Sequence, residues 1–160
     1  MTVRQSLTNF ERICLQRFRF LEEELGFVVK KKERESYGVF ITYKNPTTAI
    51  RISFEPREGG IFILISRLVE GKIPEYPIFI QPDTVLHSFY LDDVIRTKVP
   101  NFQFDFKGNK LSSSDQFERA LNEVADALKK YASDVLQGDF ESFEDAERIV
   151  KERQKALTSL

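Results

Sequence analysis

The sequence is poor in the residues from which many catalytic and structural sites are built. It contains one cysteine, Cys14, and one histidine, His87, among 160 residues. A zinc site of the usual cysteine and histidine type therefore cannot be built from one copy of the chain, and an internal disulfide bond is excluded. A lone thiol is typical of proteins kept reduced, so we expect a cytoplasmic location. We predict neither a bound metal nor a cofactor.

The chain also lacks a strong net charge and a long apolar run. Lys and Arg number 24 against 25 Asp and Glu, which leaves a net charge of -1. This balance argues against nucleic acid as a partner, because phosphate backbones are bound mainly through clustered positive charge. No uncharged apolar stretch approaches the roughly 18 residues that span a bilayer. Arg4, Glu11 and Arg12 interrupt the N-terminus, so we predict neither a signal peptide nor a membrane association.

Periodic apolar residues predict one α+β domain over residues 1–160. Its expected core is an antiparallel meander of four or five strands, packed against an N-terminal helix and a C-terminal helical hairpin. Apolar residues at steps of three and four predict helices over residues 8–25, 83–95, 115–137 and 140–157. Segments rich in β-branched and aromatic residues, separated by turn residues, predict strands over residues 27–34, 37–44, 48–55, 61–69 and 101–107.

The fifth predicted strand rests on a strict alternation. Phe102, Phe104 and Phe106 share one side of residues 101–107, and polar residues share the other. Such alternation is typical of a strand with one buried face and one wet face.

The pair Pro82-Asp83 and the later triplet Asp105-Phe106-Lys107 form a candidate catalytic pattern. It resembles the loose signature of the PD-(D/E)xK nucleases. The resemblance implies a metal-dependent hydrolase or nuclease in which Asp83 and Asp105 hold a divalent cation and Lys107 positions the attacking water. In that family the two acidic elements lie on adjacent strands, whereas a predicted helix separates them here.

The single cysteine and the single histidine have simpler interpretations. Cys14 lies on the apolar side of the first predicted helix, so we expect a buried thiol that behaves as a small hydrophobe. His87 and Asp83 share one side of the predicted helix 83–95, which would suit a general base and its partner. A solvated pair on the helix surface explains the same spacing, and we favour it.

Acidic residues without any lysine or arginine among them occupy residues 134–147. Negative charge near the start of the last helix partly explains them, and the excess would attract a basic partner. We therefore expect a small cytoplasmic protein-binding module of the immunity or adaptor type rather than an enzyme, and we leave a homodimer open. The predicted partner-binding residues are Asp134, Asp139, Glu141, Glu144, Asp145 and Glu147.

Overall fold

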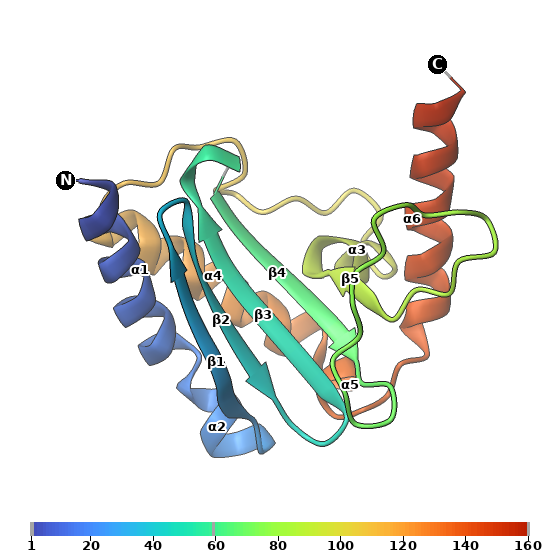
Figure 1. Ribbon diagram of the computed structural model, residues 1–160, viewed down its shortest axis with the longest axis horizontal. Coiled ribbons are helices and arrows are strands. Elements are labelled where there is room, and N and C mark those ends of the chain that lie inside the picture. Colours follow the sequence, from blue (N-terminus) through green and yellow to red (C-terminus); the bar gives the residue numbers. More distant parts are fainter. Residues whose placement is uncertain (1, 59, 160) are drawn as a thin grey trace.

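The computed structural model describes residues 2–58 and 60–159, and it shows the predicted α+β class. Five antiparallel strands form one sheet in the order β1-β2-β3-β4-β5 (Figure 1). Neighbouring strands pair in the order of the chain, as in a meander. The strands are β1 (Val28–Glu35), β2 (Gly38–Lys44), β3 (Thr48–Glu55), β4 (Gly60–Arg67) and β5 (Ser88–Tyr90).

The helices precede and follow the meander. A short 3-10 helix, η1, joins β3 to β4. Among the described residues, no helix combines the length and the apolar character that crossing a bilayer requires. The helical elements are α1 (Val3–Arg17), α2 (Arg19–Leu25), η1 (Pro56–Glu58), α3 (Leu91–Arg96), α4 (Ser114–Tyr131), α5 (Ser133–Leu136) and α6 (Ser142–Thr158).

One face of the sheet is covered by α1 and α4, which pack against each other. In Figure 1 α4 passes behind the strands and α1 lies beside β1. Alternation along the strands points Ile41, Ile52 and Ile63 to this face, where they are directly paired across β2, β3 and β4. Phe10 of α1 and Phe117 of α4 contact each other with ring centroids 5.9 Å apart. All these side chains belong to one continuous apolar cluster.

The first predicted helix differs from the structure at its start and in its continuity. Helix α1 begins at Val3, because Thr2 and Gln5 form a reciprocal capping box. Thr8, the predicted first residue, lies inside the helix, and its hydroxyl donates a hydrogen bond to the Arg4 carbonyl. The helix breaks at Phe18 and resumes as α2, which ends at Leu25, the predicted last residue. Gly26 follows in the left-handed conformation that commonly ends a helix.

The predicted strand 101–107 is wrong, because this segment forms turns and irregular structure. Its alternating phenylalanines contact one another. The rings of Phe102 and Phe104 meet edge to face with centroids 4.8 Å apart, and those of Phe104 and Phe106 stack at 5.1 Å. Phe102 also contacts Tyr131 of α4 at 5.9 Å. The aromatic rings therefore bury themselves against a helix instead of in the sheet.

The fifth strand is β5, which lies inside the predicted helix 83–95. That prediction is wrong for residues 83–90, and only α3 at its end is helical. Phe89 pairs with Ile65 of β4 and is buried, whereas Val85 is exposed. Pairing with β4 therefore outweighs the helical spacing of these apolar residues.

The C-terminal helices follow the predicted order with one break. Ser113 caps α4 in a reciprocal box with Gln116, and the helical run of residues 115–137 is interrupted at Ala132 before α5. A short connection leads to α6, which matches the predicted 140–157 within two residues at each end. Helix α4 packs against α1, whereas α6 packs against α3 and β5 at the end of the sheet.

A buried carboxylate attaches α6 to the rest of the fold. The side chain of Asp93 in α3 is 5% exposed and pairs with Arg96 at 3.1 Å. Arg153 of α6 donates a second charged hydrogen bond to the same oxygen. Charge-assisted hydrogen bonds are stronger than neutral ones. These contacts add to the apolar packing of α6, whose buried Phe143 has its ring centroid 4.7 Å from that of Phe89 in β5.

Replacement of this carboxylate tests its role. The Asp93→Asn variant leaves Arg153 without its charged partner and Arg96 with only Asp92, 4.0 Å away. We therefore expect the free energy of unfolding to fall by about 2 kcal/mol. Denaturant unfolding measures the change. Asp145→Asn is the control, because its pair with Arg148 is on the surface and should contribute less than about 1 kcal/mol. Equal losses in the two variants would contradict the assignment.

Candidate functional site

The six acidic residues predicted to bind a partner lie around α5 and the start of α6. Three of them have cations beside them. The Asp134 carboxylate is 3.3 Å from Lys98, that of Asp145 is 3.0 Å from Arg148, and that of Glu147 is 3.7 Å from Lys151. Neither Lys98 nor Lys151 belongs to residues 134–147, so the sequence segment alone overstates the local charge.

The other three acidic residues carry the remaining negative charge. Asp139 accepts a hydrogen bond from the Glu141 backbone, 3.1 Å away. Glu141 and Glu144 are exposed. We call Asp139, Glu141 and Glu144 the acidic corner. Its role in binding stays a prediction.

The residues of the nuclease-like pattern contact different parts of the protein. Pro82, next to Asp83, accepts a hydrogen bond from Lys151 of α6 at 2.8 Å. The Asp105 backbone donates to Glu123 of α4 at 2.8 Å. Lys107 lies 3.7 Å from Asp92 of α3. In the described part of the chain, no group of three or more His, Cys, Asp or Glu side chains could hold a metal ion.

The structure also shows the surroundings of the two single residues. Cys14 is buried, and this burial raises the pKa of its thiol far above the usual value, so the side chain is a neutral core residue. The helix that would align His87 with Asp83 does not form. Instead His87 Nδ1 lies 3.3 Å from the Arg67 guanidinium, on the neighbouring strand β4.

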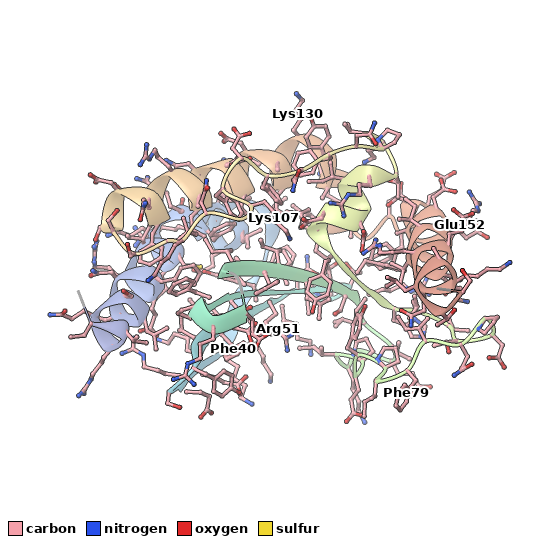
Figure 2. The ribbon with its side chains drawn as sticks, turned by 90° about the horizontal axis from the view of Figure 1, so that it is seen from above. Phe40, Arg51, Phe79, Lys107, Lys130 and Glu152 are labelled. Carbon is pink, nitrogen blue, oxygen red and sulfur yellow. The ribbon has the colours of Figure 1, made fainter. Side chains whose placement is uncertain are left out.

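The second face of the sheet carries a set of side chains that the sequence analysis did not assign to a site. We call it the open face. Figure 2 shows Phe40 and Arg51 directed away from the helical layer. Register places Phe40, Ser53 and Phe62 in one row across β2, β3 and β4. The neighbouring row contains Thr42, Arg51, Leu64 and Tyr90.

Aromatic rings contact one another along both borders of the open face. The Tyr37 and Phe40 ring centroids are 5.9 Å apart, and the Arg51 guanidinium lies over Phe40 at 5.8 Å. On the other side Phe62 and Tyr90 are 6.3 Å apart. Ser53 separates Phe40 from Phe62 on the middle strand, so a small side chain lies between two large rings.

The β4–β5 loop, residues 68–87, covers one end of this face. Ser66 and Ser88 are buried there and share a hydrogen bond of 2.7 Å. Tyr76 of the loop contacts Tyr90 with centroids 5.9 Å apart. A groove remains between the loop and the sheet, and Lys31, Arg51 and Glu75 are among the residues that line it. The other end, beside Tyr37 and Phe62, forms a second hollow.

Positive and negative side chains balance in these two hollows. Four cations and four carboxylates line them. Such a surface combines aromatic rings and arginine with both signs of charge, which is the composition of contacts between proteins. The charged residues are Lys30, Lys31, Arg51, Arg57, Glu33, Glu55, Glu58 and Glu75.

The alternation of β2, β3 and β4 contains a signal for this site. Phe40, Arg51 and Phe62 occupy the positions opposite to the core residues of their strands. Large aromatic side chains at positions expected to face water indicate either a covering layer or a binding surface. Whether a covering layer or a binding surface is present depends on where the helices pack, and the alternation of the strands does not predict that.

A half-buried carboxyl lies on the opposite side of the protein, between α4 and residues 105–111. Glu123 accepts a hydrogen bond from the backbone of Asp105. Burial raises the pKa of Glu123 above its ordinary value of 4.5, and the nearby charge of Asp105 raises it further. The folded protein therefore binds this proton more tightly than the unfolded chain does.

This shift predicts a pH dependence of stability. The contribution of Glu123 is complete at low pH and is lost as the pH rises through the raised pKa. In Glu123→Gln the free energy of unfolding should fall less than in the wild type as the pH rises above 4.5. Denaturant unfolding at a series of pH values measures this. Asp126→Asn, an exposed change on the same helix, should follow the wild type, and parallel curves for all three proteins would contradict the shift.

Comparisons with known proteins add no independent evidence about function. Neither the protein-family models nor the curated proteins nor the solved structures searched contain a match to this chain.

Proposed function

We propose that this protein is a protein-binding module whose partner docks on the open face of the sheet. One observation carries the proposal. Helices cover one face of the sheet, whereas Phe40 and Arg51 point away from them (Figure 2). Phe62 lies in the same row as Phe40 and lines a hollow at the end of this face. Aromatic residues and arginine supply most of the binding energy at protein interfaces when they become buried.

The charge balance supports a polypeptide as the partner on this face. Nucleic acid requires an excess of positive charge to replace the counterions of its phosphates. The hollows beside Arg51 and Arg57 contain as many carboxylates as cations. A protein surface with charges of both signs can pair with such an arrangement, and the pairing selects one orientation.

The acidic corner is the second surface to be tested. Glu141 and Glu144 are exposed, as a binding role for a basic partner requires. The cations beside Asp134, Asp145 and Glu147 weaken the negative electrostatic potential that all six predicted acidic residues would otherwise produce. The open face therefore supports binding better, and the acidic corner would add attraction at long range.

Site-specific cross-linking distinguishes these surfaces. A photoreactive amino acid is placed at Arg51, at Glu144 or at Lys130 in the full chain and irradiated in cells that produce it. Figure 2 shows Lys130 on the helical side, away from Arg51. We expect a covalent adduct with another polypeptide at position 51 and none at position 130. An adduct confined to position 144 would transfer the proposal to the acidic corner, and adducts with nucleic acid alone would overturn it.

A substitution beside the probe gives the second readout. With the photoreactive residue at position 51, Arg57→Glu reverses one charge of the neighbouring hollow. One unfavourable charge contact at an interface corresponds to about a tenfold loss of affinity, so the adduct yield should fall strongly. Lys130→Glu makes the same change of charge on the helical side and should leave the yield unchanged. Equal yields in both variants would contradict a partner on the open face.

A further inference from the structure

The β4–β5 loop exposes apolar side chains to an unusual extent. Ile78 is 90% exposed and Phe79 is 78% exposed. Single exposed apolar residues are common on protein surfaces, but adjacent large ones next to a groove indicate a contact site. The groove, of about 630 Å³, lies between Phe79–Pro82 and α6. Figure 2 shows Phe79 and Glu152 at this end of the protein.

Hydrogen bonds hold the loop against α6, so the groove exists before any partner binds. Lys151 donates to the carbonyl of Pro82 at 2.8 Å. The backbone of Leu86 donates to Glu147 at 2.8 Å. Lys151 and Glu147 also form an ion pair with each other, at 3.7 Å. A surface that is already ordered loses little conformational entropy on binding.

The second half of α6 extends past the body of the protein, as Figure 1 shows. Residues 152–159 are exposed throughout. Among the described residues, neither Glu152 nor Lys155 has an ion-pair partner, and both line the groove. They are three residues apart, so they lie on neighbouring positions of one side of the helix.

We propose that a second copy of this chain docks in this groove, with the two α6 helices antiparallel. A two-fold axis between residues 153 and 154 places Glu152 of each copy opposite Lys155 of the other. The same surface is then used twice, and each contact occurs in reciprocal form. The β4–β5 loops of the two copies lie on the same side of the helix pair. There the other copy covers Ile78 and Phe79 of each loop. The other two cations of the groove, Arg148 and Lys151, are paired with Asp145 and Glu147 of the same helix, which limits repulsion between the copies.

This dimer is independent of the proposed function. The open face and the α6 groove share no lining residue, so Arg57→Glu should leave the dimer intact. Glu152→Lys should likewise leave the adduct yield at position 51 unchanged. Failure of one proposal is thus distinguishable from failure of the other.

Charge exchange tests the dimer. The wild type should have twice the 18.7 kDa chain mass in sedimentation equilibrium at high concentration. Glu152→Lys places like charges together at both reciprocal contacts, and so does Lys155→Glu, so each variant alone should dissociate at least about tenfold more easily. A mixture of the two variants restores two opposite-charge contacts and should form a one-to-one complex. Glu144→Lys, on the same helix but outside the groove, is the matched control.

The outcomes are decisive in both directions. Recovery of the dimer in the mixture, but not in either variant alone, establishes the antiparallel pairing, because a folding defect cannot be repaired by mixing. Phe79→Ser should also weaken the wild-type dimer. A wild type that stays at the chain mass at every concentration would overturn the proposal. A dimer that neither charge variant weakens would do so too.

Discussion

Phe10, Phe54 and Phe117 meet where α1, β3 and α4 converge, and their contact decides which face of the sheet is buried. The Phe54 ring centroid lies 5.3 Å from that of Phe10 and 4.9 Å from that of Phe117. Burial of this apolar face is the main source of stability. Because α1 and α4 both pack on one face, they leave the opposite face uncovered except where the β4–β5 loop lies over it.

The position of α6 follows from a second constraint. Asp93 is buried at the start of α3 and needs positive charge beside it, which Arg96 and Arg153 supply. Arg153 and the buried apolar residues of α6, among them Phe143, together hold α6 against α3 and β5 at the end of the sheet. The remaining turns of α6 extend beyond the body, and the groove beside the loop results from this placement.

The net charge of a surface region of this protein depends on which residues the fold brings together, and not only on the local sequence. Residues 134–147 look strongly acidic in the sequence, yet Lys98 precedes α4 and Lys151 lies further along α6. Lys98 comes next to the acidic segment only through the tertiary fold, whereas Lys151 pairs with Glu147 one turn away on the same helix. The open face shows the converse, because Arg51 and Arg57 come from different elements and share a balanced surface with carboxylates from several others.

By itself the sequence determined the α+β class, the meander of β1 to β4, the end of α2 at Gly26 and the approximate extent of α6, because periodicity and turn residues act locally. Only the tertiary structure decided the rest. Ser88–Tyr90 is too short to show a strand period and exists because β4 offers it pairing. The alternation of residues 101–107 is that of a strand, but its three phenylalanine rings pack on one another instead, and Phe102 packs on Tyr131 of α4. The candidate surfaces depend on which face the helices cover, and that choice is made by contacts between residues far apart in the chain.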